Sequence, residues 1–250
     1  GLRGMMEELF GRAGGHCRGK GGSMHIADFS VGMLGANGVV AGGIPIAVGA
    51  AQGLKLLGSS AVVACFFGDG AINRGPFLEG LNWAALYKLP VLFVCEDNGV
   101  AAFTQAASVT AGPGVGARAE SLGVPSLTVD GNDAVMVDNA TARLVAEVRA
   151  GAGPRLLHAT TYRLTGHTST DPAAWRNAAD VEAARAAEPL GRLRARLLSE
   201  GVASKTLGTI EGDAGAEMAS ARAAALAAPW PDPDIAWEDV QDSGALLETA

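Results

Sequence analysis

A strand–helix–strand pattern in the first half of the chain constrains its fold more than any other feature. Residues 61–67 form a short apolar run with the length and composition of a buried strand. Residues 91–95 form a second buried strand, and residues 76–87 between the two strands predict a helix that buries one apolar face, made of Phe77, Leu78, Leu81, Ala84 and Ala85. A strand, a helix and a strand within this length make a βαβ unit, in which the two strands lie parallel. The sequence therefore predicts an α/β fold built on a mostly parallel sheet.

Polar residues follow both predicted strands. Asp69 stands between Gly68 and Gly70 after the first strand, and Asn98 comes soon after the second. The carboxyl ends of parallel strands meet at one edge of a sheet, where open α/β folds bind ligands. Asp69 and Asn98 offer two hard oxygens, and Gly70 and Ala71 offer backbone N–H groups near the start of a helix. This combination suits a divalent cation that holds a diphosphate.

The spacing of these residues resembles a cofactor signature. Gly68-Asp69-Gly70, 26 further residues and then Asp97-Asn98 resemble the thiamine diphosphate motif, in which Gly-Asp-Gly is followed at about that distance by Asn-Asn. Further segments narrow the resemblance to the α-subunit of two-oxo acid dehydrogenases, the decarboxylating first component of the pyruvate, branched-chain and acetoin dehydrogenase complexes. Those segments are residues 19–25, 75–79, 88–90, 129–133, 161–167 and the tail 229–240.

The resemblance implies the fold and the activity. It implies a thiamine diphosphate-binding fold, with helices on both faces of the sheet and a C-terminal helical extension. The implied enzyme is an oxidoreductase of the pyruvate dehydrogenase (acetyl-transferring) type. It oxidatively decarboxylates a small 2-oxo acid, pyruvate first, and passes the acyl group to lipoyl groups of an acyltransferase. Three alternatives stay open: an acetoin dehydrogenase α-subunit, half of another thiamine enzyme such as a split transketolase, and a divergent subunit without catalytic activity.

The resemblance also assigns site residues. It makes the side chains of Asp69 and Asn98 and the backbone carbonyl of Val100 the ligands of Mg²⁺. His167 and His25 are the candidate catalytic residues. The implied cofactor-binding residues are Gly38, Val40, Asp69, Gly70, Ala71, Asn73, Asn98, Arg163 and His167. Each polar member also has a plainer interpretation: Asn73 as a helix cap, Arg163 as a surface arginine and His167 as a solvated loop histidine. We interpret Thr168 to Thr170 as ordinary polar loop residues and not as phosphorylation sites.

Departures from the family pattern are as informative as the matches. Asp97 stands where the family has the first Asn of its pair, and Val100-Ala101 replace Tyr-Gly. We expect that the sequence is truncated, because a phosphate-gripping N-terminal segment of the family has no counterpart here. No Glu matches the carboxylate that activates the pyrimidine ring. In the family a β-subunit supplies it, which implies an α2β2 heterotetramer with thiamine diphosphate between α and β.

The remaining pattern predicts one domain, residues 1–250, with a helical extension and tail over 170–250. The Gly- and Ala-studded helix predicted over 39–57 suits close packing, either against another subunit or inside the monomer. The other predicted elements are a surface loop over 104–116, strands over 126–129 and 155–161, and helices over 117–122, 134–150, 181–201 (interrupted near Pro189) and 204–228.

Composition excludes several classes of protein. The net charge of −7 argues against a nucleic-acid binder, which needs a basic surface. Three cysteines, an odd number, give no disulfide framework, and we expect Cys65 and Cys95 to be core residues. The longest apolar stretch, residues 39–51, is too short to span a membrane. We therefore expect a cytoplasmic protein.

Overall fold

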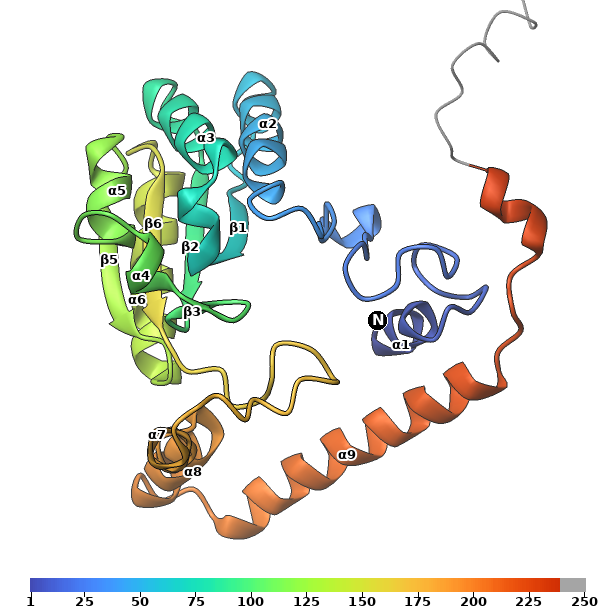
Figure 1. Ribbon diagram of the computed structural model, residues 1–250. Coiled ribbons are helices and arrows are strands. Elements are labelled where there is room, and N and C mark those ends of the chain that lie inside the picture. The colour runs from blue at the N-terminus through green and yellow to red at the C-terminus, as the bar shows by residue number, and fades with distance from the viewer. Residues whose placement is uncertain (239–250) are drawn as a thin grey trace, which may run out of the picture. The chain divides into compact units, whose positions relative to one another are not determined.

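The computed structural model describes residues 1–238 and divides the chain into two compact units (Figure 1). The sheet unit comprises residues 39–203, and the terminal unit comprises residues 1–38 with the chain from residue 204 onward. Of the tail predicted over 229–240, the last two residues lie outside the described part. No helix in residues 1–238 combines the length and the hydropathy needed to cross a membrane.

The sheet unit is built on four parallel strands in the order β1-β2-β6-β5. Their bounds are β1 Val63–Gly68, β2 Val91–Asp97, β5 Ser126–Asp130 and β6 Arg155–Thr160. The register places Gly68 beside Glu96 and Asp97 beside Thr160, so all four carboxyl ends lie at one edge. The predicted parallel βαβ unit is confirmed, because β1 and β2 are hydrogen-bonded neighbours joined through a helix.

Helices cover both faces of this sheet, as predicted. Phe93 and Cys95 of β2 pack on α2 (Gly43–Leu56), α3 (Gly75–Leu86) and α5 (Val115–Ser121) within one buried cluster. Leu92 and Val94 point the other way and pack in a second cluster with α6 (Ala134–Arg149). Successive side chains of a strand face opposite sides, so a strand covered on both sides is apolar throughout. This explains why β2 shows no alternation.

Two local predictions were wrong in detail. The helix predicted from residue 39 begins only at Gly43, and Val39 and Val40 before it are exposed. Leu78, expected on the buried face of α3, is also exposed, while Gly80 is buried in its place. A Cβ on Gly80 would lie 2.6 Å from the side chain of Ile44, so a glycine lets α2 and α3 approach closely. Close approach of two helices therefore decides which residues α3 buries.

The segment predicted as a loop over 104–116 contains regular structure. β3 (Val100–Ala101) and β4 (Thr104–Gln105) form a small antiparallel hairpin, followed by α4 (Ala106–Val109) and the start of α5. Elements of two to four residues are too short to leave a periodic pattern in a sequence.

The chain after β6 forms two helices, α7 (Ala178–Ala186) and α8 (Pro189–Ser199). Asn177 caps the first, and Glu188 caps the second through the N–H groups of Leu190 and Gly191. Arg192 of α8 donates to Asp130 at a distance of 2.7 Å, which ties this helix to the end of β5. The break predicted near Pro189 is confirmed, since proline is favoured in the first turn of a helix.

The terminal unit consists of α1 (Leu2–Leu9), two short 3₁₀ helices η1 (Phe29–Val31) and η3 (Pro233–Trp237), and the long helix α9 (Ser204–Ala227). The guanidinium of Arg12 lies 3.7 Å from the centre of the Trp230 ring, and the N–H of Ala13 donates to the carbonyl of Pro229. These contacts join the start of the chain to the segment after α9.

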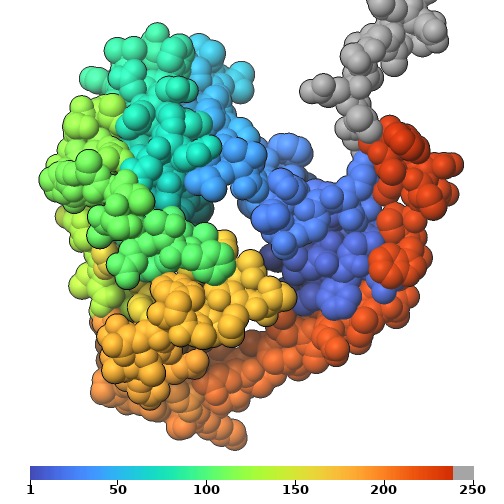
Figure 2. Space-filling model, in the orientation of Figure 1, coloured from blue at the N-terminus to red at the C-terminus, as the bar shows by residue number. Residues whose placement is uncertain are grey.

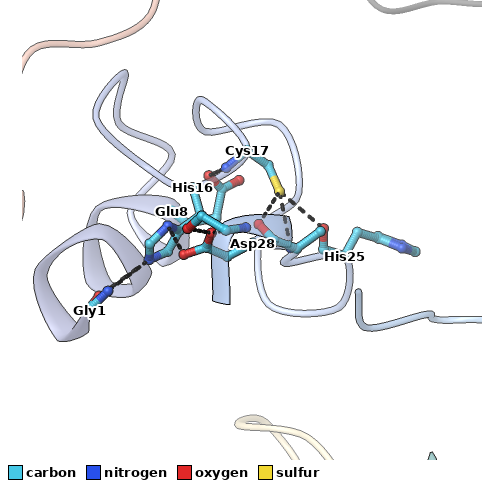
Figure 3. Close-up of polar contacts among 8 residues, drawn as sticks. Gly1, Glu8, His16, Cys17, His25 and Asp28 are labelled. Atoms are coloured by element: carbon cyan, nitrogen blue, oxygen red, sulfur yellow. Dashed lines mark hydrogen bonds and ion pairs between the residues drawn. The ribbon is translucent and has the colours of Figure 1, made fainter. Parts of the chain in front are cut away.

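A buried carboxylate organises the glycine-rich loop that follows α1 (Figure 3). Glu8 is fully buried. Its Oε2 accepts hydrogen bonds from the N–H groups of Cys17 and Gly19 at 2.8 and 2.9 Å, and its Oε1 accepts from Gly21 and Gly22 at 2.6 and 3.2 Å. Burial raises the pKa of Glu8, but the four backbone hydrogen bonds outweigh it and leave the pKa below its ordinary value.

We predict that Glu8→Gln destabilises the protein by about 2 kcal/mol, because the amide NH₂ of glutamine would face two of the four backbone donors. Thermal unfolding and amide hydrogen exchange of Gly19 to Gly22 measure the effect. Glu7→Gln is the control, since it removes only an ion pair of 2.7 Å with Arg3. Because folding lowers the pKa of Glu8, its contribution is complete above the unfolded pKa and is lost as the pH falls through the folded one. Equal unfolding temperatures of wild type and Glu8→Gln near neutral pH would contradict this role.

Candidate functional site

Asp69 occupies the carboxyl edge of the sheet as a buried acid. It directly follows β1 and begins the 3₁₀ helix η2 (Asp69–Asn73). Only 3% of the residue is exposed, and Oδ2 is buried without a hydrogen-bond partner among the described residues. Burial raises the pKa of Asp69, and the negative charge of Asp97 adds to this effect. A buried carboxylate oxygen without a partner is costly, so this atom suits a cation.

Asn98 lies in the tight turn after β2. Its Oδ1 accepts from the N–H of Val100 at 3.2 Å, and Oδ1 of Asp97 accepts from the N–H of Gly99 at 2.9 Å. Gly99 has a φ of 74°, which a glycine adopts without strain. Asp69 and Asn98 each follow one of the adjacent parallel strands β1 and β2. The prediction that these two strand ends lie at one edge of the sheet is confirmed.

The available donors fit a hard cation. Within residues 1–238 no three His, Cys, Asp or Glu side chains gather to hold a metal. The predicted donors at this edge are instead the Asp69 carboxylate, the Asn98 amide oxygen and the backbone carbonyl of Val100. All three are oxygens, as Mg²⁺ prefers, and such sites commonly take their remaining ligands from a phosphate or water.

Arg163 and His167 lie together beyond the end of β6. Nη2 of Arg163 donates to the carbonyl of Ala102 at 2.7 Å, and Nη1 lies 3.1 Å from Nδ1 of His167. The ring of Phe103 meets the His167 ring edge-on, with 5.7 Å between centroids. The β3–β4 hairpin thus holds both side chains, and Figure 2 shows its surface in green beside the yellow surface of the chain after β6. Nε of Arg163 is buried and has no hydrogen-bond partner within residues 1–238.

A cavity of about 290 Å³ opens beside these groups. Its lining contains Asn98, Val100 and Arg163 from the predicted set, together with aromatic and polar residues that sequence reasoning missed. Those missed residues are Gln105, Tyr162, Trp175, Arg176, Asn177 and Asp180. A larger cavity of about 520 Å³ lies between α1 and α9. We place the site at the smaller one, because its lining contains Asn98 and Val100, two of the three predicted metal donors, and Arg163; Asp69 is not part of the lining.

Arg176 is the most connected of the missed residues. Its Nη1 donates to the backbone carbonyl of Arg163. Its guanidinium lies 5.4 Å from the centre of the Tyr162 ring and 5.2 Å from that of Trp175, within the range of cation–π attraction. No pattern in the sequence marked Arg176, because its role depends on which residues the folded loop brings beside it.

The side chain of Asn73 is already engaged. Its Nδ2 donates to the hydroxyl of Thr110 at 3.0 Å, and its Oδ1 accepts from Nη1 of Arg118 at 2.5 Å. Arg118 also donates to the carbonyls of Ile72 and Ala111. Asn73 therefore fastens the end of η2 to α5 and the chain before it.

The other predicted site residues are divided between the two units, with two in the terminal unit and three in the sheet unit. Gly38 and His25 lie together in the terminal unit, where a Cβ on Gly38 would be 3.3 Å from the His25 ring. Val40 is an exposed residue at the start of the sheet unit. Gly70 and Ala71 lie in η2, next to Asp69.

Gly70 is needed for space and not for its backbone angles. Neither Gly68 nor Gly70 has a positive φ, so their backbone angles do not require glycine. A Cβ on Gly70 would lie 2.8 Å from the Cβ of Ala101 in the β3–β4 hairpin, closer than carbon atoms pack. The glycine therefore lets the hairpin reach η2.

Comparison with known proteins places the chain in a family. Residues 1–234 match the family described as dehydrogenase E1 component. The chain belongs to this family. It is 42% identical over 238 residues to the α-subunit of acetoin:2,6-dichlorophenolindophenol oxidoreductase from Cupriavidus necator, covering 94% of this chain and 72% of that one. The α-subunit of the same name from Bacillus subtilis is 48% identical over 170 residues, with 68% of this chain and 51% of the relative covered.

Pyruvate dehydrogenase relatives match this E1 α-subunit over a similar extent. The E1 component α-subunit of Zymomonas mobilis is 38% identical over 228 residues, covering 91% of this chain and 64% of the relative. A solved structure from Mycobacterium smegmatis, assigned as a thiamin diphosphate-dependent enzyme, is 26% identical with a TM-score of 0.42, and covers 53% of this chain and 24% of that one. The chain thus spans between about half and three quarters of the length of these curated relatives.

We predict that Gly70→Ala destabilises the sheet unit by about 1–3 kcal/mol, because the added methyl group clashes with Ala101. The double variant Gly70→Ala with Ala101→Gly removes the opposing methyl group and should recover most of this loss. Chemical denaturation of the two single variants and the double variant measures the coupling. Strictly additive effects would contradict the close approach of the hairpin to η2.

Proposed function

We propose that this E1 α-subunit binds thiamine diphosphate and Mg²⁺ at the carboxyl edge of the sheet and acts on acetoin as part of an α2β2 enzyme. One observation carries the proposal: Oδ2 of Asp69 is buried at the same sheet edge as Asn98 and has no hydrogen-bond partner in the described part of the chain. A cation would satisfy this oxygen, and a diphosphate would complete the cation's ligands. When bound, thiamine diphosphate supplies a carbanion that adds to a carbonyl group and then acts as an electron sink.

The chain's own residues would bind and orient that cofactor. Asp69, Asn98 and the carbonyl of Val100 would hold the metal ion. The N–H groups of Gly70 and Ala71 and the guanidinium of Arg163 would bind the diphosphate, since a guanidinium matches phosphate oxygens well. Asn73 would contribute to the diphosphate site by holding η2 in place, because its side-chain amide is already hydrogen-bonded.

Two histidines would serve the substrate. His167, held between Arg163 and Phe103, is exposed and would orient the substrate or transfer a proton. His25 would do the same from the glycine-rich loop that Glu8 holds. Gly38 and Val40 would contact the aminopyrimidine ring through their backbone atoms.

Acetoin is favoured over the pyruvate that the sequence analysis put first. Two α-subunits named for acetoin match at 42% and 48% identity, whereas three matching pyruvate dehydrogenase α-subunits, from Porphyra purpurea, Zymomonas mobilis and Rattus norvegicus, are 41%, 38% and 35% identical. Pyruvate is the second candidate, because the Porphyra match is nearly as high as the first acetoin one. In either case the acyl group would pass to the lipoyl group of an acyltransferase.

The helix α2 supports an assembly with further subunits. A Cβ on Gly49 or Gly53 would meet no atom within 4 Å, and Leu56 and Leu57 at the end of the helix are about four-fifths exposed. An apolar surface of this kind suits burial in an interface. The β-subunit would occupy part of it and supply the carboxylate that activates the cofactor.

The expected result of reconstitution is activity only in the mixture. The chain alone should not reduce 2,6-dichlorophenolindophenol, and the chain co-purified with its β-subunit should do so with acetoin at least about tenfold more efficiently than with pyruvate. A preference for pyruvate would establish the second candidate, and equal activity of the chain alone would refute the shared site. Asp69→Asn in the same complex should lose Mg²⁺-dependent cofactor binding in calorimetry, whereas Asp130→Asn, whose carboxylate pairs with Arg192, should keep it.

A further inference from the structure

Three side chains from neighbouring strands form a hydrogen-bonded row beneath the proposed metal site. Nε2 of His158 on β6 lies 2.8 Å from Oδ2 of Asp97 at the end of β2. Nδ1 of the same ring lies 3.1 Å from the hydroxyl of Thr128 on β5. Thr128 is the direct register partner of His158, and Asp97 is two residues beyond its partner Cys95. The three side chains therefore project from the same face of the sheet.

Every group in this row is used. Oδ1 of Asp97 accepts from the N–H of Gly99, and Oδ2 faces His158. A neutral imidazole that donates from Nε2 and accepts at Nδ1 from the Thr128 hydroxyl satisfies both contacts. The side chains of His158 and Asp97 are only 14% and 22% exposed, so the hydrogen bond between them is partly shielded from water, whereas the one to Thr128 is exposed.

Asp97 fixes the turn that carries two proposed metal donors. Its carboxylate closes that turn at Gly99, between Asn98 and Val100. Asp97 itself has both oxygens occupied, so it shapes the site and is not one of the metal ligands. Position 97 holds Asn in the pattern that the chain resembles. A carboxylate here has no hydrogen to donate and depends on donors around it, which makes His158 its necessary partner.

We propose that His158 is a positioning residue, which holds Asp97 and thereby the turn that presents Asn98 and Val100 to the metal ion. The inference rests on the proposed function, because it concerns the same Mg²⁺ site. Substitution of a residue that supports a metal ligand from outside commonly lowers the metal affinity by about tenfold or more. Nothing in the sequence pattern marked His158, since it lies inside an apolar strand.

The test compares two substitutions of the histidine in the co-purified complex of this chain with its β-subunit. His158→Leu removes the donor to Asp97. His158→Gln keeps an N–H group near the position of Nε2. Calorimetric titration of Mg²⁺ in saturating thiamine diphosphate should show an increase of about tenfold or more in the Mg²⁺ dissociation constant for the Leu variant. The Gln variant should stay within about threefold of wild type.

Two further variants separate positioning from general stability. Arg155→Gln breaks an ion pair of 2.7 Å with Glu147 at the opposite end of the same strand, and should leave the Mg²⁺ dissociation constant unchanged. Asp97→Asn should make the histidine less important, so the effect of His158→Leu should shrink in that background. If His158→Leu does not fold, Thr128→Val replaces it, and we then expect a several-fold weaker Mg²⁺ binding.

The outcomes distinguish this inference from the function on which it rests. Absence of Mg²⁺-dependent cofactor binding in the wild-type complex would overturn the proposed function and the inference with it. Binding by the wild type, with the same Mg²⁺ dissociation constant in His158→Leu or its replacement, would overturn the inference alone. A lower unfolding temperature with unchanged Mg²⁺ binding would show a merely structural histidine and would also overturn it.

Discussion

The parallel pairing of β1, β2 and β6 decides where the polar groups of the candidate site lie. Each strand is a run of mostly apolar residues that ends in a polar one, and parallel hydrogen bonding brings those ends to one edge. Asp69, Asn98 and Arg163 are up to 94 positions apart in the sequence, yet they follow three adjacent strands. The helices on both faces of the sheet bury the apolar runs and so fix this edge in place.

Burial of charge at that edge gives the site its chemistry. Asp69 is buried, its Oδ2 has no hydrogen-bond partner among residues 1–238, and its pKa is raised, first by burial and then by Asp97. The isolated subunit therefore carries an acidic group in an unfavourable position, which binding of a cation would relieve. The opposite arrangement occurs in the terminal unit, where four backbone N–H groups fully satisfy the buried carboxylate of Glu8. The Glu8 carboxylate is satisfied by its own loop, whereas the Asp69 carboxylate is the one proposed to bind a cation.

The sequence predicted the sheet and the proposed metal donors Asp69 and Asn98, but not the residues that hold the site in place. The apolar runs and the spacing from Asp69 to Asn98 predicted the βαβ unit, because strand length and burial leave a direct trace in composition. His158 and Arg176 left no such trace. Their roles depend on which strand or loop lies beside them, and the register of β2 with β6 is a tertiary property. The β3–β4 hairpin was not predicted for a related reason, because its position depends on a tertiary contact. Gly70 of η2 has no side chain, which leaves room for Ala101 of the hairpin.

The most direct test of the account is the position of the metal ion. Crystals of the complex with the β-subunit, grown with Mn²⁺ in place of Mg²⁺ and with thiamine diphosphate, would reveal the metal by its anomalous scattering. The account predicts one metal ion bonded to Oδ2 of Asp69, Oδ1 of Asn98 and the carbonyl of Val100, with the diphosphate completing its ligands. A metal ion bound elsewhere, or cofactor bound with Oδ2 of Asp69 still without a partner, would contradict it.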